Sequence, residues 1–148
     1  MYRTWAQPVT PGPARRAVYI LNRRSFRFPF FEAFDPPNTA TSSPLRQTTT
    51  VPAQTLTLLN NPVVGAQAGA MASRLTREAG SSVESCVKRA WLLAYNRAAD
   101  AGELQLALEF IAGAEAAHAS AGAADAHATA LVEFCLALMN TTEFIYTN

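Results

Sequence analysis

The chain has 148 residues and a formal net charge of +1, with 49% hydrophobic and 16% charged residues. This length suits one domain and this composition is typical of a globular protein, which excludes an intrinsically disordered chain. No apolar run approaches the roughly 18 residues that a membrane-spanning helix needs. The charge gives no overall bias toward nucleic acid or anionic lipid, and two cysteines cannot build a disulfide framework.

The composition changes near residue 62. All nine prolines fall at or before Pro62, and residues 1–62 carry seven arginines against two acids. The other 86 residues carry nine acids against five basic residues, and 23 of them are alanine. We therefore predict a mainly α protein, a single domain or domain fragment over residues 1–148. It would comprise a bundle of about four to five helices over residues 53–148 and an irregular Pro-, Arg- and Phe-rich arm and loop over residues 1–52.

The N-terminal arm interleaves arginines with aromatic residues. Five phenylalanines lie between positions 26 and 34, where a proline-initiated short helix is expected over residues 29–34. The simplest interpretation places these rings in a hydrophobic core, and the arginines against the acidic helical part or in solvent. The residues that we single out for interaction are Arg15, Arg16, Arg23, Arg24, Phe30, Phe31, Glu32, Phe34 and Asp35.

Two other functions remain as alternatives for the same segment. Glu32 and Asp35, three residues apart and followed by a Thr-rich loop over residues 39–50, are compatible with an accessory role in a polysaccharide-acting enzyme. Basic residues between aromatic ones are also found where proteins bind single-stranded nucleic acid. The nearly neutral overall charge argues against nucleic acid as a partner, and solvated acids at a helix end are commoner than a catalytic pair.

From residue 53 onward, hydrophobic spacing and turn residues predict five helices. The first covers residues 54–60, the second runs from Pro62 to about residue 79, and Gly80 closes it. A third helix is capped by Ser81 or Ser82. Its predicted buried face is the clearest in the chain and consists of Val83, Cys86, Val87, Ala90, Trp91, Ala94 and Tyr95.

The last two helices have acidic N-caps. Asp100 and Glu103 have the spacing of a capping box at the start of the fourth helix, whose apolar face is Leu104, Ala107, Leu108 and Ile111. Asp125 caps the fifth helix, whose apolar face is Leu131, Cys135, Leu138 and Met139. Residues 112–124 extend the fourth helix and then form a loop. The apolar tail over residues 143–146 is expected to dock against the bundle.

The sequence holds no recognised catalytic or metal-binding motif, which favours a non-catalytic protein without settling whether it is an enzyme. Cys86 and Cys135 lie on apolar helix faces, so we interpret them as buried small hydrophobes, with a disulfide as the alternative in an oxidising compartment. His118 and His127 are interpreted as surface residues, because two isolated histidines fall far short of a metal signature. We predict no catalytic, cofactor-binding or metal-ligating residue in this chain.

Six segments in order along the chain carry a family resemblance: residues 15–19, 23–26, 30–35, 51–60, 134–140 and 143–146. With its Arg-Arg pairs, the Phe-Phe-Glu-Ala-Phe-Asp run and the Leu-Leu-Asn helix end, the chain resembles the C-terminal part of the planctomycete-type cytochrome-associated domain of unknown function, the PSD family. The resemblance implies a fragment of a large exported protein, with upstream domains as partners and haem c in a cytochrome domain elsewhere. It thus implies a periplasmic or extracellular location, whereas a chain complete as given would be cytoplasmic.

Overall fold

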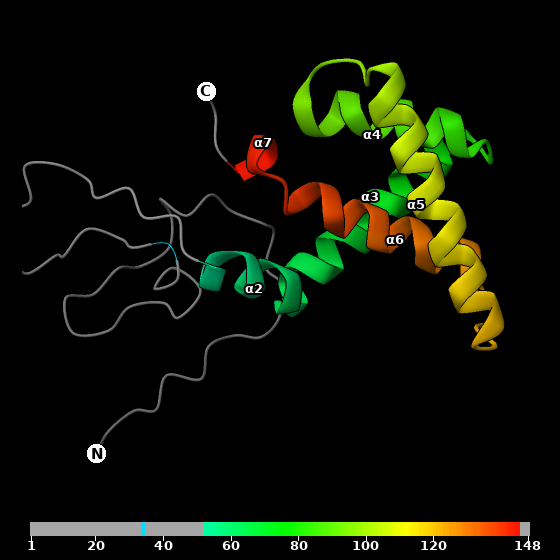
Figure 1. The fold of residues 1–148 in the computed structure, drawn as a ribbon, viewed down its shortest axis with the longest axis horizontal. Helices are drawn as coiled ribbons and strands as arrows, with labels where there is room; N and C mark the ends of the chain where they lie inside the picture. The colour runs from blue at the N-terminus through cyan, green and yellow to red at the C-terminus, as the bar shows by residue number, and fades with distance from the viewer. Residues whose placement is uncertain (1–33, 35–51, 146–148) are drawn as a thin grey trace, which may run out of the picture. The chain divides into compact units, whose positions relative to one another are not determined.

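The computed structural model describes residue 34 and residues 52–145, and divides the chain into two compact units, Met1–Thr49 and Thr50–Asn148. The described residues of the second unit form six helices and no strand, which confirms the predicted mainly α bundle (Figure 1). The helices are α2 (Pro52–Asn60), α3 (Pro62–Ala79), α4 (Val83–Tyr95), α5 (Ala101–Ser120), α6 (Ala126–Met139) and α7 (Thr142–Ile145).

Capping residues set the helix boundaries, and most of them were predicted from the sequence, although the Asn61 cap was not. The side chain of Asn61 accepts a hydrogen bond from Val63 N at 2.8 Å, with Pro62 in the first turn of α3. Gly80 ends α3 at φ 77°, a left-handed conformation that glycine adopts without the steric penalty of a Cβ. Of the two candidate serines, Ser82 is the cap of α4. Each of these contacts joins residues a few positions apart in the sequence, so helix ends of this kind can be predicted without the fold.

Helix α6 is the centre of the bundle, because it packs against every other helix that the structure describes. Its composition explains this position: Glu133 is the one charged residue among its fourteen, so the helix has apolar side chains on most of its surface. Its buried residues are Ala130, Leu131, Phe134, Cys135 and Leu138. Burial of the predicted face of α4 is confirmed at Cys86, Val87, Ala90 and Trp91, whereas Val83, Ala94 and Tyr95 are only partly buried.

Helices α5 and α6 form an antiparallel hairpin that is unevenly packed along its length. The buried residues of α5 are Ala107 and Ile111, both in its N-terminal half. No residue between positions 112 and 129 is buried. The far end of the hairpin, which we call the α5–α6 tip (residues 112–129), therefore extends away from the core (Figure 1).

The C-terminal tail differs in part from expectation. Residues 142–145 form the short helix α7, which contacts α4 and α6, but none of its residues is buried and Phe144 is 43% exposed; Tyr146 lies outside the described residues. The polar side chain of Glu143, rather than apolar burial, supplies its strongest contact, as described below. The hydrophobicity of the tail correctly predicted that it docks against the bundle. The side chain that holds it, however, is the polar Glu143 and not an apolar residue.

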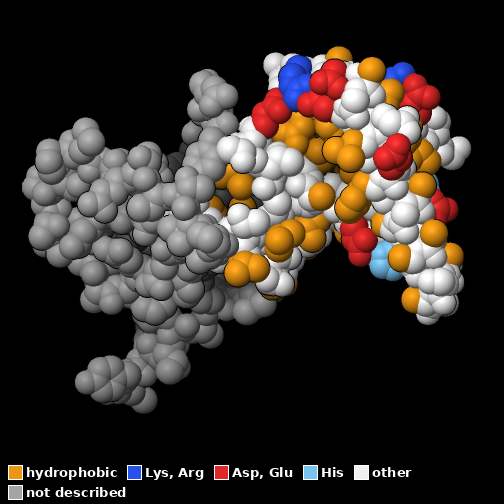
Figure 2. Space-filling view, viewed as in Figure 1, with side chains coloured by type: hydrophobic (Ala, Val, Ile, Leu, Met, Phe, Trp, Pro, Cys, Tyr) orange, Lys and Arg blue, Asp and Glu red, His pale blue; other side chains and the backbone are white. Residues whose placement is uncertain are grey.

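Charged side chains gather at one end of the helical unit, over the α4 region at the top of Figure 2. Among the charged side chains of the described helices, Glu78 of α3 bonds to Arg74 on its own helix and to Arg89 of α4, at 2.7 Å in each case. Among the described helices, the structure contains none long and apolar enough to cross a lipid bilayer.

Truncating Trp91 tests the assignment of the core. Trp91 is 7% exposed, and its ring stacks on Phe134 with centroids 6.0 Å apart. We expect Trp91→Ala to lower the free energy of unfolding by about 3–5 kcal/mol in urea denaturation, as large core truncations do. Leu106→Ala, at a side chain that is 69% exposed, serves as the control and is expected to change it by less than about 0.5 kcal/mol. Equal stability of the two variants would contradict the assignment.

Candidate functional site

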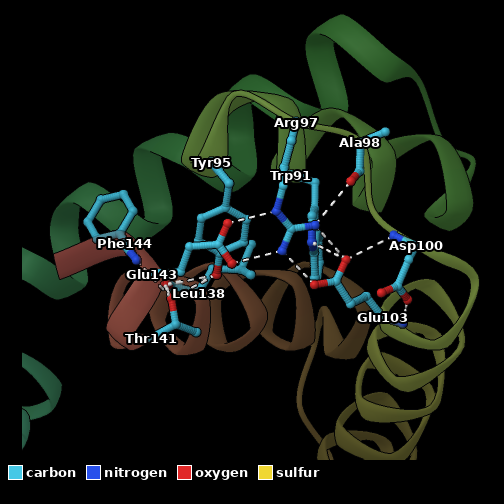
Figure 3. A network of polar contacts seen from close by, with 10 residues as sticks. All are labelled: Trp91, Tyr95, Arg97, Ala98, Asp100, Glu103, Leu138, Thr141, Glu143 and Phe144. Carbon is cyan, nitrogen blue, oxygen red and sulfur yellow. Dashed lines mark hydrogen bonds and ion pairs between the residues drawn. The ribbon is translucent and has the colours of Figure 1, made fainter. Parts of the chain in front are cut away.

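The strongest polar cluster of the described chain is built on the turn between α4 and α5. Helix α4 ends at Tyr95, and its C-cap residue Asn96 adopts the left-handed conformation at φ 56° and ψ 28°. Asparagine is one of the few non-glycine residues that tolerate this region. The turn it makes places Arg97 beside the N-terminus of α5 and beside α7 (Figure 3).

Arg97 binds two carboxylates, each through two hydrogen bonds. Its Nη1 and Nη2 donate to Glu103 Oε2 and Oε1 at 2.8 and 2.6 Å. Its Nε and Nη2 donate to Glu143 Oε1 and Oε2 at 2.7 and 2.8 Å. The remaining Nη1 bond goes to the carbonyl oxygen of Ala98 at 3.1 Å. These five bonds match the five N–H donors of a guanidinium, so Arg97 has no donor left for a ligand.

Glu103 joins this cluster to the core. Its side chain accepts from Asp100 N at 2.8 Å, while the Asp100 side chain accepts from Glu103 N at 2.7 Å, which is the capping box predicted from the sequence. Trp91 Nε1 donates to the same carboxylate at 3.1 Å. The Arg97 guanidinium, and then the Asp100 backbone N–H, lower the pKa of Glu103 from its usual 4.5 to about 2.

Tyr95 closes the cluster on the side of α7. Its hydroxyl lies 2.8 Å from Thr141 Oγ1, at the start of α7, and the guanidinium carbon of Arg97 lies 5.5 Å from the centre of its ring. Burial raises the pKa of Tyr95. The Arg97 guanidinium lowers the pKa of Glu143. We call Arg97, Glu103 and Glu143 the Arg97 clamp, since together they connect the end of α4 to the start of α5 and to α7.

The geometry of the Arg97 clamp favours a structural role over a chemical one. Both of its carboxylates are held in their ionised form, whereas a general acid or base works best with a pKa near the operating pH. All five N–H donors of the Arg97 guanidinium are bonded to groups of the protein itself. Two bidentate contacts fix the directions of three helices relative to one another. The arrangement can therefore position helices, but offers no group prepared to transfer a proton or bind an anion.

The cysteines behave as the sequence predicted for small hydrophobes. Cys86 and Cys135 are both buried free thiols. Burial raises the pKa of Cys135 to about 12 and also raises the pKa of Cys86. A thiol must lose its proton to act as a nucleophile, so neither is prepared for catalysis.

Both histidines are partly exposed, by 26% at His118 and 41% at His127, which agrees with their interpretation as surface residues, and each contacts a glutamate. His118 Nε2 lies 2.9 Å from Glu133 Oε1, and His127 Nδ1 lies 3.1 Å from Glu115 Oε2. Within the described ranges, no group of three or more His, Cys, Asp or Glu side chains is arranged to hold a metal ion.

The interaction residues predicted from the sequence all fall in the first unit, Met1–Thr49. Phe34 is described, as a partly buried residue in a turn. Arg15, Arg16, Arg23, Arg24, Phe30, Phe31, Glu32 and Asp35 lie outside the described residues, as do the short helix expected over residues 29–34 and the Thr-rich loop. Their roles stay predictions.

From the sequence we identified Glu103 of the Arg97 clamp, but not Arg97 or Glu143. The spacing of Asp100 and Glu103 identified the capping box. It gave no reason to single out Arg97, which lies in a turn without periodicity, or Glu143, which lies 46 residues further along the chain than Arg97. The available signal was that Arg97 is the one basic residue after position 89. An isolated cation among acids is a candidate for pairing with more than one of them.

The fold and this site define a helical domain whose strongest polar cluster joins its own helices. Over residues 3–111 the chain matches the family PSD1, described as a protein of unknown function (DUF1553), and it belongs to this family. The match includes the segments 15–35 and 51–60 that carried the resemblance, and ends before the segments at residues 134–146. Neither the curated proteins nor the solved structures include a match to this chain.

The ionised state of Glu103 predicts a loss of stability in acid. Its pKa is below the unfolded value, so its contribution is complete above about pH 4.5 and is lost as the pH falls toward 2. We expect the free energy of unfolding in urea to fall less over this window in Glu103→Gln than in the wild type. Glu109→Gln, a change of the same type on the same helix, should follow the wild-type curve. Parallel curves for all three proteins would contradict this role.

Removing the cation of the clamp should release α7. In Arg97→Gln we expect faster hydrogen exchange at Phe144 N and Ile145 N, which bond to the Thr141 carbonyl at 3.2 Å, because Glu143 loses its partner. Arg77→Gln, an equal change of charge on α3, should leave these two amides unchanged. If Arg97→Gln also leaves them unchanged, the clamp does not hold α7.

Proposed function

We propose that this chain is a non-catalytic structural or partner-binding domain of the planctomycete-type, cytochrome-associated kind. In this proposal it forms the C-terminal part of a larger exported protein, periplasmic or extracellular, in which haem c is bound elsewhere. Membership of the DUF1553 family supports the domain assignment. The exported, cytochrome-linked parent protein rests on the sequence resemblance.

The observation that carries the structural role is the complete occupation of Arg97. A binding or catalytic arginine keeps donors free for its ligand, whereas this one uses its donors on Glu103, Glu143 and a backbone carbonyl. A similar shared contact occurs between α3 and α4. There the Glu78 carboxylate of α3 pairs with Arg74 on its own helix and with Arg89 of α4. Charged groups used in this way fix the arrangement of a scaffold.

The partner proposed for this scaffold is the upstream part of the same parent protein. Residues 1–62 carry five more basic than acidic groups and five clustered phenylalanines. Aromatic and arginine side chains are enriched where proteins bind one another. We therefore assign the partner-binding surface to the candidate interaction residues between Arg15 and Asp35.

The parent protein can be tested at the level of its gene. We expect the DNA upstream of the Met1 codon to continue in frame into a segment that encodes a signal peptide and a CxxCH haem-attachment motif. An in-frame stop codon immediately before Met1 would overturn the exported, cytochrome-linked part of the proposal.

The partner surface can be tested by binding. The upstream part and this chain would be expressed separately and their affinity measured by calorimetry. We expect Arg15→Gln/Arg16→Gln to raise the Kd by at least about tenfold. Replacing an arginine at the centre of an interface often costs about 2 kcal/mol or more of binding free energy. The control, Arg77→Gln/Lys88→Gln, removes the same charge from exposed positions on α3 and α4 and should bind like the wild type. Equal affinities of the two double variants would overturn the assignment.

A further inference from the structure

Helix α7 is held against the bundle mainly by polar contacts. Glu143 binds the guanidinium of Arg97 through two hydrogen bonds, at 2.7 and 2.8 Å. The Thr141 hydroxyl, at the start of α7, lies 2.8 Å from the Tyr95 hydroxyl. None of the four residues of α7 is buried, and the side chains of Arg97 and Glu143 are 40% and 46% exposed. Apolar burial therefore adds little to the docking of α7.

A helix as short as α7 does not persist through its own backbone hydrogen bonds. It has four residues, whereas isolated helices shorter than about 12 residues are marginal in water. An exposed ion pair contributes little free energy, although the bidentate geometry of Arg97 and Glu143 sets where α7 docks. Local release of such a segment costs much less free energy than unfolding the bundle.

Release of α7 leaves Arg97 held in place. Glu103 keeps its bonds to Nη1 and Nη2, at 2.8 and 2.6 Å, and the Ala98 carbonyl keeps its bond to Nη1. Glu103 is fixed in turn by Asp100 N and Trp91 Nε1, neither of which belongs to α7. The donors that become free are Nε–H and one Nη2–H, which lie on the edge of the guanidinium that faces Glu143 (Figure 3). We call this the Arg97 edge.

The Arg97 edge is suited to a carboxylate. Two parallel N–H donors on a planar guanidinium match the two oxygens of a carboxylate, which is the geometry that Glu143 uses when α7 is docked. The Tyr95 hydroxyl, released from Thr141, adds a polar group on the side of α7. The Glu103 carboxylate remains bonded to the same guanidinium, so a doubly charged phosphate meets more repulsion there than a singly charged carboxylate does.

We propose that α7 is a latch over a carboxylate-binding site, the Arg97 edge, and that a glutamate-bearing segment of a partner protein takes this site when α7 is released. The segment that occupies the site in the structure is α7 itself, in which Phe144 follows Glu143. With α7 docked, Arg97 has no free donor, so the two carboxylates compete for one edge. The site belongs to the helical unit and uses none of the interaction residues between Arg15 and Asp35, so it is independent of the proposed function.

The probe for this site is a peptide with the sequence of residues 141–145, acetyl-Thr-Thr-Glu-Phe-Ile-amide, added to the full chain. Binding is followed by the NMR signals of the Arg97 Nε–H and the Asp100 backbone N–H. In Glu143→Ala, which opens the latch and removes no buried side chain, we expect saturable binding in the millimolar range. In the wild type we expect the Kd to be at least about fivefold higher, because α7 competes. No binding to Glu143→Ala would overturn the site, and equal Kd values in the two proteins would overturn the latch.

Matched variants locate the binding. Adding Arg97→Gln to Glu143→Ala should abolish the response of the Asp100 signal to the glutamate peptide. Adding Arg77→Gln, the same change of charge on α3, should leave the response unchanged. If the peptide binds Arg97→Gln/Glu143→Ala as tightly as Glu143→Ala, the Arg97 edge is not the site.

Matched ligands test the chemistry of the site at constant ionic strength. A peptide with glutamine in place of the glutamate should bind at least about tenfold more weakly, because its amide offers one acceptor oxygen and no charge. Inorganic phosphate should also bind more weakly than the glutamate peptide, since Glu103 stays on the guanidinium. Equal affinity for the glutamine peptide, or phosphate binding as tight as that of the glutamate peptide, would overturn the assignment to a carboxylate.

Discussion

The structure depends on the burial of one helix. Helix α6 packs against every other described helix, and Leu131, Phe134, Cys135 and Leu138 are all at most 4% exposed. A helix that is apolar on most sides is stable only when other helices cover it, because exposed apolar surface costs about 25 cal/mol for each Å². The other helices are thus arranged around α6, and α3, α4 and α5 each contribute buried apolar residues to the core that they form with it.

Polar contacts then fix the orientations of the helices, which apolar burial does not determine by itself. Hydrophobic contact has little directional preference, so it does not by itself set the angle of α5 or the position of α7. At one end of the helical unit the Arg97 clamp orients α5 and α7. Arg97 makes a bidentate contact to each of two carboxylates, and the indole N–H of Trp91 donates to Glu103. Along the outer part of the α5–α6 hairpin, the His118–Glu133 and His127–Glu115 contacts join the two helices.

This division bears on function. The charged groups with the strongest contacts are turned toward one another, and the most perturbed carboxylate, Glu103, is ionised at any physiological pH. A perturbed pKa often marks a catalytic group, but ion-pair networks that hold a fold perturb pKa values as well. Here the five donors of Arg97 decide between the two explanations, since each already has an acceptor within the domain. For the Arg97 clamp itself, a structural role agrees with this chemistry better than a catalytic one does.

The sequence by itself determined the helices and most of their ends. Pro62, Gly80, Ser82 and Asp125 act through contacts within a few residues, so their effect can be predicted without the fold. The capping box at Asp100 and Glu103 was predictable for the same reason. The apolar face of α4 was also correct, because its spacing matches the helical repeat over three turns.

Only the tertiary structure decided which distant charges meet. Arg97 and Glu143 are 46 residues apart, and His118 and Glu133 lie on different helices, so no local pattern connects either pair. The direction of α5 brings Glu103 to Arg97, and the docking of α7 brings Glu143 to the same guanidinium. Ion pairs require both position and orientation, and these are settled only after the helices have packed around α6. For this reason the sequence predicted the elements and their buried faces, while the polar contacts that orient them followed from the assembled bundle.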